Sequence, residues 1–130
     1  IENLQAIVGV PDFLTLQETV KKIYVDNSVK EYIASVVAAT RNHTAIHLGA
    51  SPRGSLALFR TAQARALMQG RDFALPDDVK ALAVHVLAHR LIVRPSAEPR
   101  DRSGRTFITE ILEGVPVPGT VPVRSAKTQN

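Results

Sequence analysis

The stretch Leu48-Gly49-Ala50-Ser51-Pro52-Arg53 decides how this chain folds, because it starts a helix in a defined way. Ser51 is a favourable N-cap and Pro52 suits the first helical position, so the sequence predicts a helix over 52–69. Arg53 then lies in the first turn, where unpaired backbone N–H groups already carry partial positive charge. A cation there is disfavoured unless an anion arrives, so the stretch is typical of a phosphate-facing helix start.

Two capping-box patterns upstream predict two further helices. The sequence TLQE at 15–18 predicts a short helix over 15–25, and SVKE at 28–31 predicts a helix over 28–42. Residues 1–13 end in a turn-forming Gly-Val-Pro-Asp run, so they are interpreted as a connector from an upstream domain.

Downstream, Gly70 occupies the usual position for ending a helix, and Pro76 starts another. Residues 77–93 are apolar around most of the helix and predict the central, most buried element. Leu75 before this helix is a poor N-cap. Residues 106–113 predict a short last helix, and residues 71–75 could pair with 46–48 as very short strands. The fold class is therefore mainly α, a bundle of four to five helices over 14–114, followed by a proline-containing flexible tail over 115–130.

The composition is that of an ordinary globular domain. The chain of 130 residues is 45% hydrophobic, 22% charged and only 5% aromatic, which favours an aliphatic core between helices. It has no cysteine, which excludes disulfides and thiol chemistry. The longest uncharged stretch, 33–40, is far too short to span a membrane, so a cytoplasmic location is expected. The net charge of +4 would favour an anionic partner.

Other chemical patterns are weak. His85 and His89 have the spacing of two zinc ligands, but no glutamate base stands between them, so no metal site is expected. Asp77 and Asp78 are explained by the helix start that they occupy. The chain has neither a nucleophile elbow nor a P-loop, so it cannot cradle a nucleoside triphosphate alone. From the residues alone, three interpretations of Arg53 are open: a phosphate ligand, an exposed arginine, or an arginine paired with a carboxylate such as Asp72.

A set of chained motifs resembles the C-terminal lid of MoxR-type AAA+ ATPases over about residues 14–118. The motifs are Val25-Asp26, Thr40-Arg41, Gly49-Ala50-Ser51-Pro52-Arg53, Ala57-Leu58 with Arg60, Gly70-Arg71-Asp72-Phe73, Pro76-Asp77-Asp78-Val79-Lys80-Ala81-Leu82-Ala83 and Val86-Leu87-Ala88-His89-Arg90-Leu91. The chain departs from the family at Gly54, where alanine is usual, and at Leu75, where a threonine-like cap is common.

The resemblance implies a role for the chain in a composite ATP site. Arg53 would be the second-sensor arginine that reaches the terminal phosphates, with Ser51, Pro52 and, more weakly, Arg60 beside it. An upstream AAA+ core would supply the P-loop, Mg²⁺ and catalytic groups, so the whole protein would hydrolyse ATP while this chain alone would not. The expected partners are that core, neighbouring subunits of a hexameric homo-oligomeric ring and client proteins, without nucleic acid or membrane.

Two alternatives come from other classes of protein. A helical nucleic-acid-binding module would use Arg53, Arg60 and Arg65 against phosphates. A structural adaptor without a ligand would tolerate any replacement of Arg53.

Overall fold

The computed structural model describes residues 6–95 and 103–119 of the chain. Within them, five α-helices, one 3₁₀ turn and one pair of strands follow each other along the sequence. Their order is α1 (Val10–Lys22), α2 (Asn27–Asn42), β1 (Ile46–Leu48), α3 (Pro52–Met68), α4 (Pro76–Leu87), η1 (Ala88–Arg90), β2 (Ile92–Val93) and α5 (Gly104–Gly114). The predicted class, a mainly α bundle with a very short strand pair, is confirmed.

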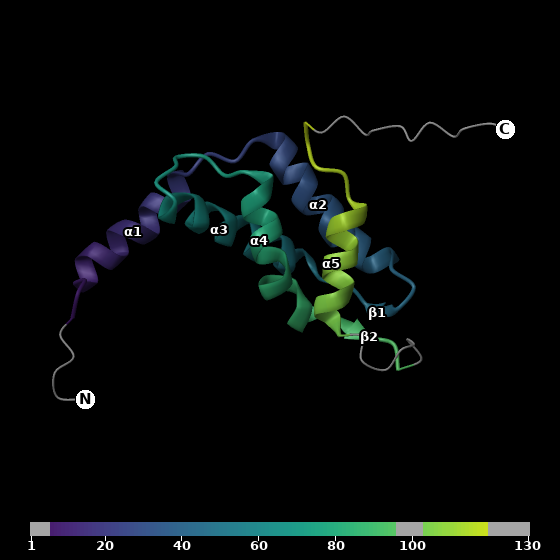
Figure 1. Cartoon of the computed structure of the whole chain (residues 1–130). Helices are drawn as coiled ribbons and strands as arrows, with labels where there is room; N and C mark the ends of the chain where they lie inside the picture. The colour runs from purple at the N-terminus through teal and green to yellow at the C-terminus, as the bar shows by residue number, and fades with distance from the viewer. Residues whose placement is uncertain (1–5, 96–102, 120–130) are drawn as a thin grey trace.

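Helix α4 contacts α2, α3 and α5 and lies at the centre of the bundle. It packs against α3 on one side and α5 on the other, and α2 contacts all three of these helices. Helix α1 contacts α3 but extends away from the other helices toward its N-terminal end (Figure 1). None of the described helices is both long and apolar enough to cross a bilayer.

The start of α1 differs from the prediction. The helix begins at Val10, with Pro11 in its first turn, rather than at residue 15, and it ends at Lys22 rather than 25. The Thr15 hydroxyl does not cap a helix start but donates to the Pro11 carbonyl at 2.9 Å. Instead, the Asp12 carboxylate accepts from the Gly9 N–H at 3.2 Å, so residues 10–13 belong to the helix. The predicted connector over 1–13 therefore overlaps the start of α1, and its residues 1–5 lie outside the described residues.

The N-cap of α2 also differs from the prediction. Asp26, not Ser28, caps the helix, because its carboxylate accepts from the Ser28 N–H at 2.9 Å. Ser28 also donates its hydroxyl to the Asp26 carboxylate. The residue predicted as the N-cap is therefore a hydrogen-bond donor to the observed N-cap.

Helix α3 begins at Pro52 with Ser51 as N-cap, as predicted, and Gly70 follows its end. Gly70 has a φ of +71°, and the N–H groups of Gly70 and Arg71 donate to the carbonyls of Leu67 and Ala66 at 2.9 Å each. These two bonds form a Schellman motif, which is the physical reason for a glycine at this position.

The strand pair connects other segments than predicted. β1 pairs antiparallel with β2, so the predicted pairing of 46–48 with 71–75 is wrong. Phe73 instead forms an isolated parallel bridge with Tyr24. The predicted helix over 77–93 therefore ends early, because Ile92 and Val93 belong to the strand that pairs with β1.

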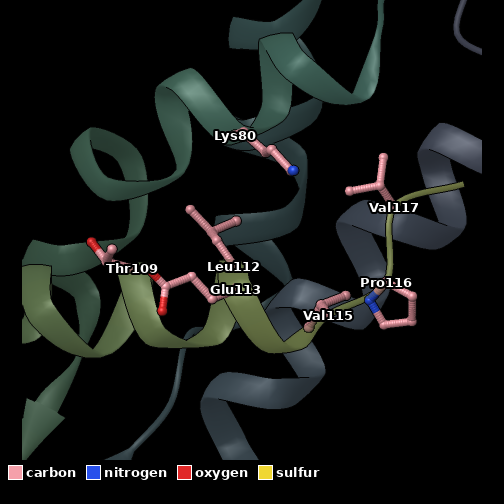
Figure 2. A pocket seen from close by; sticks show the side chains of 7 residues that line it. All are labelled: Lys80, Thr109, Leu112, Glu113, Val115, Pro116 and Val117. Atoms are coloured by element: carbon pink, nitrogen blue, oxygen red, sulfur yellow. The ribbon is translucent and has the colours of Figure 1, made fainter. Parts of the chain in front are cut away.

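The segment after α5 packs on the bundle as far as the structure describes it. Val115 and Val117 are partly buried against the core, and Val115 donates its N–H to the Ile111 carbonyl at 2.9 Å. Lys80 of α4, Leu112 of α5 and Val117 point toward a shared hollow (Figure 2). Residues 115–119 thus differ from the predicted flexible tail, and the rest of that tail, 120–130, lies outside the described residues.

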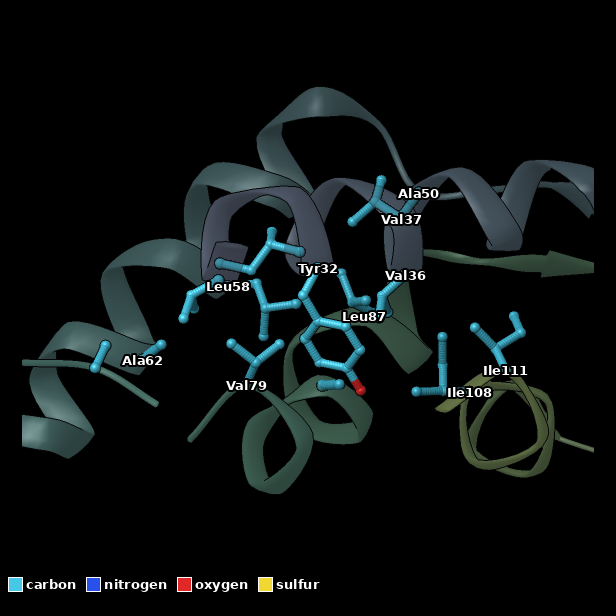
Figure 3. Close-up of a cluster of buried hydrophobic side chains, with 14 of the residues drawn as sticks. Tyr32, Val36, Val37, Ala50, Leu58, Ala62, Val79, Leu87, Ile108 and Ile111 are labelled. Carbon is cyan, nitrogen blue, oxygen red and sulfur yellow. The ribbon is translucent and has the colours of Figure 1, made fainter. Parts of the chain in front are cut away.

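The core lies between α2, α3, α4 and α5 (Figure 3). Its large, fully buried side chains are Tyr32, Val36, Val37, Leu58, Val79, Leu87, Phe107 and Ile108. Only Tyr32 and Phe107 in this set are aromatic, as expected from the composition. This core fixes the end of α2 beside the start of α3, where the candidate site lies.

Candidate functional site

Residues 49–51, here called the pre-α3 loop, are bound to the last turn of α2. The Ala50 N–H donates to the Thr40 Oγ1 at 2.9 Å, and the Ala50 carbonyl accepts from the Arg41 Nε at 3.0 Å. Thr40 and Ala50 are both completely buried. The two peptide groups that flank the Ala50 Cα are therefore each held by a side chain of α2.

Gly49 lets the pre-α3 loop approach α2 closely. A Cβ atom at this position would lie 2.7 Å from the Arg41 backbone nitrogen and 2.8 Å from its Cα. No side chain fits there without a backbone shift, so glycine is required by the contact.

Gly54 packs the first turn of α3 against α4. A Cβ atom there would lie 3.1 Å from the Leu87 Cδ2 and 3.3 Å from the Ala50 Cβ. Gly54, where the resemblance leads to an expected alanine, therefore lies at a tightly packed contact, and glycine also has a low helix propensity.

Arg53 is exposed at the start of α3. In the part of the chain that the structure describes, its side chain makes no hydrogen bond and no ion pair, and the pairing with Asp72 considered above does not form. The Ser51 hydroxyl makes no capping bond, although its carbonyl accepts from the Gly54 N–H at 2.8 Å. Both groups are available to an external ligand.

A pocket of about 610 Å³ opens beside this helix start. Its lining carries basic side chains and no carboxylate, and it consists of Arg41, His47, Leu48, Gly49, Ala50, Ser51, Pro52 and Arg90. Arg90 uses its Nε to bond the Val86 carbonyl at 3.0 Å. The electrostatic potential around the start of α3 therefore favours an anion.

Arg60 and Arg65 have other roles than Arg53. Arg60 donates to the Gln63 Oε1 at 3.0 Å and lies over the Phe59 ring at 5.5 Å. Arg65 pairs with Asp78, its Nε lying 3.3 Å from Oδ1. The three arginines do not form a row of free cations, so the nucleic-acid-binding alternative is not favoured.

Asp78 links the start of α4 to the C-terminal end of α3, the end away from the pre-α3 loop. Its carboxylate is buried, accepts two bonds from the Arg71 guanidinium at 2.7 and 2.9 Å, and accepts the Leu75 N–H at 2.8 Å. Burial alone would raise the pKa of Asp78, but the Arg71 and Leu75 hydrogen bonds and the nearby arginine charges lower it. The leucine side chain cannot accept a hydrogen bond at the start of α4. The Asp78 carboxylate provides a capping bond there instead, to the Leu75 N–H.

The two histidines with zinc-like spacing lie in different elements, His85 in α4 and His89 in η1. Across residues 6–95 and 103–119 no group of three or more histidine, aspartate or glutamate side chains could hold a metal ion.

Sequence reasoning predicted Ser51, Pro52 and Arg53 as site residues, and the structure places all three at the start of α3, but it did not predict the residues that hold and surround them. Thr40 and Arg41 were noted only as a motif, and His47 and Arg90 were not identified as site residues. Their role depends on tertiary contacts, which the local pattern does not report. The one available signal was that Thr40-Arg41 closes a helix shortly before the pre-α3 loop.

Comparisons with known proteins point to one family. A family model described as the AAA lid domain matches residues 38–111. Protein YeaC of Bacillus subtilis is 42% identical over 118 residues, which cover 91% of this chain and 37% of YeaC. Chaperone MoxR1 of Mycobacterium tuberculosis is 33% identical over 121 residues, which cover 86% of this chain and 32% of MoxR1.

A solved structure agrees with these sequence matches. The crystal structure of a candidate ATPase from Cytophaga hutchinsonii superposes with a TM-score of 0.81 at 34% identity, over 87% of this chain and 37% of that one. The chain therefore spans about a third of the length of the proteins it matches.

Proposed function

Because this chain belongs to the AAA lid domain family, we propose that it is the lid of a MoxR-like ATPase and that Arg53 contacts the terminal phosphates of bound ATP. The relative named MoxR1 and the solved ATPase structure support the first part. The second part depends on the geometry around the start of α3.

The observation that carries the proposal is an exposed arginine, without an acidic partner among the described residues, on a rigidly held helix start. A guanidinium can bond two phosphate oxygens at once. The helix N-terminus and the basic pocket beside it add favourable potential for an anion near the start of α3; Arg41, His47 and Arg90 line this pocket, and Arg53 lies outside its lining. The residues present therefore fit a phosphate ligand.

The rest of the site would come from outside this chain. A preceding AAA+ core would supply the P-loop, Mg²⁺ and the groups that activate water, and neighbouring subunits would complete a homo-oligomeric, hexameric ring. Contact between Arg53 and the phosphates would draw the lid toward the core, and loss of the terminal phosphate would release it. In this role the ring remodels client proteins in the cytoplasm, and the chain alone has no ATPase activity.

The test is Arg53→Ala in the full-length protein. A hydrogen bond to a charged group contributes about 1.5–3 kcal/mol, so the variant should lose about 10- to 150-fold in kcat/KM for ATP. Steady-state phosphate release measures this loss.

Arg105→Ala is the matched control, because Arg105 is also the second helical residue after a serine N-cap, at the start of α5. It should keep ATPase activity close to wild type. Wild-type kcat/KM and wild-type client remodelling in Arg53→Ala would refute the phosphate contact and favour an adaptor without a ligand.

A further inference from the structure

We propose that Thr40 and Arg41 are positioning residues for Arg53: they fix the pre-α3 loop and thereby the direction in which the Arg53 side chain leaves α3. This inference rests on the proposed phosphate contact of Arg53 and adds the residues that make it geometrically possible.

Thr40 holds the first peptide group of the loop. Its hydroxyl donates to the Val37 carbonyl at 2.6 Å, so a lone pair is left to accept the Ala50 N–H at 2.9 Å. Both residues are completely buried, so water cannot replace Thr40 as the partner of this N–H. The hydroxyl therefore has a fixed hydrogen-bonding direction and a single position.

Arg41 holds the second peptide group. Its Nε donates to the Ala50 carbonyl at 3.0 Å, and Arg41 also lines the basic pocket. Gly49 lies against the Arg41 backbone so closely that a Cβ atom would be 2.7 Å from its nitrogen. The loop has no room to slide along α2.

Ser51 and Pro52 connect Ala50 to Arg53 with little freedom, so the position of Ala50 determines where Arg53 lies. The Ser51 carbonyl already accepts the Gly54 N–H at 2.8 Å, and the Pro52 ring fixes its own φ. A rotation of the Ala50 peptide groups would therefore turn the start of α3 and move the Arg53 guanidinium. A misplacement of about 1 Å in a reacting site can cost about 100-fold in rate.

The competing explanation is that Thr40 and Arg41 only stabilise the fold. The two explanations differ in one respect: positioning acts through Arg53, whereas a general loss of stability does not. A double-mutant cycle separates them, because residues that act through one another are not additive.

The experiment measures kcat/KM for ATP in the full-length protein for Thr40→Val and Thr40→Ser, each with and without Arg53→Ala. Valine has the shape of threonine but no hydroxyl, and serine keeps the acceptor. We expect Thr40→Val to lose about tenfold in the wild-type background and less than about twofold beside Arg53→Ala. Thr40→Ser should stay within about threefold of wild type, and Thr61→Val, which removes a hydroxyl bonded only within α3, should match wild type.

Arg41→Lys provides a second test that does not alter a buried position. Lysine keeps the positive charge but cannot place an N–H where the Arg41 Nε lies. Positioning predicts about a tenfold loss that again disappears beside Arg53→Ala, whereas a charge effect alone predicts wild-type activity. This variant also decides the question if Thr40→Val does not fold, which thermal unfolding of each variant reveals.

The outcomes distinguish the two levels of the proposal. Equal losses in both backgrounds, or an active Thr40→Val and Arg41→Lys beside an impaired Arg53→Ala, overturn positioning and leave the phosphate contact intact. A fully active Arg53→Ala overturns the phosphate contact itself, and positioning with it.

Discussion

At the scale of single residues, the junction between α3 and α4 depends on Asp78. The side chain of Asp78 is 3% exposed, and it is bonded by Arg71 and Leu75 and paired with Arg65. A buried carboxylate is tolerated only when its lone pairs are used, and removing the charge leaves its partners uncompensated.

Asp78→Asn should therefore lower the free energy of unfolding by about 2–3 kcal/mol. This value lies at the low end for a broken buried pair, because Arg71 and Arg65 are 23% and 42% exposed. Asp77→Asn is the control: Asp77 is exposed in the same first turn and should cost less than about 1 kcal/mol. Urea unfolding at neutral pH measures both, and equal effects would contradict the buried network.

The pH dependence follows from the lowered pKa of Asp78. A lowered pKa means that the carboxylate stabilises the fold fully above its usual value of 3.8 and that this contribution is lost as the pH falls through the lowered value. The difference in unfolding free energy between wild type and Asp78→Asn should thus be constant near neutrality and shrink below pH 3.8. From the sequence alone, Asp77 and Asp78 were both explained by their position at a helix start. The sequence pattern could not show that Arg65 and Arg71 pair with Asp78 and not with Asp77.

At the scale of elements, local signals predicted both ends of α3, whereas the capping-box patterns at 15–18 and 28–31 gave the wrong N-caps for α1 and α2. Ser51-Pro52 and Gly70 set both ends of α3, because N-caps, a first-turn proline and a positive φ act within a few residues. The end of α4 was not predictable, since Ile92 and Val93 continue an apolar run and only their pairing with β1 makes them a strand. The same division holds at the candidate site, where the local pattern predicted Arg53 at a helix start but not the bonds from Thr40 and Arg41 to Ala50.

Gly70→Ala tests the local signal at the end of α3. The substitution forces a side chain into a φ of +71°, so it should lower the free energy of unfolding by about 1 kcal/mol although nothing lies within 4 Å of the new Cβ. Gly114→Ala is the matched variant at the end of α5, where space is equally open and no positive φ is required. It should be neutral or stabilising by up to about 1 kcal/mol, and an equal loss in both variants would contradict the Schellman explanation.

At the scale of the whole molecule, one core is shared by four helices and α1 stands outside it. No residue of α1 is buried, and Phe13, Leu14 and Leu16 are 57%, 54% and 48% exposed. Helix α5 is shorter, yet it buries Phe107, Ile108 and Ile111. Both segments have apolar residues at helical spacing, Leu16 and Val20 in the first and Ile108 and Ile111 in the second, and this local spacing could not show which segment joins the core.

This difference predicts two levels of stability within the chain. A helix of this length is marginal alone in water, and α1 gains little from burial, whereas α5 opens only when the shared core opens. Backbone amides of α1 should therefore exchange with deuterium at least about tenfold faster than those of α5, at equal intrinsic rates. Hydrogen exchange read by NMR at each amide of the chain measures the ratio, and equal protection in α1 and α5 would show that α1 unfolds together with the core.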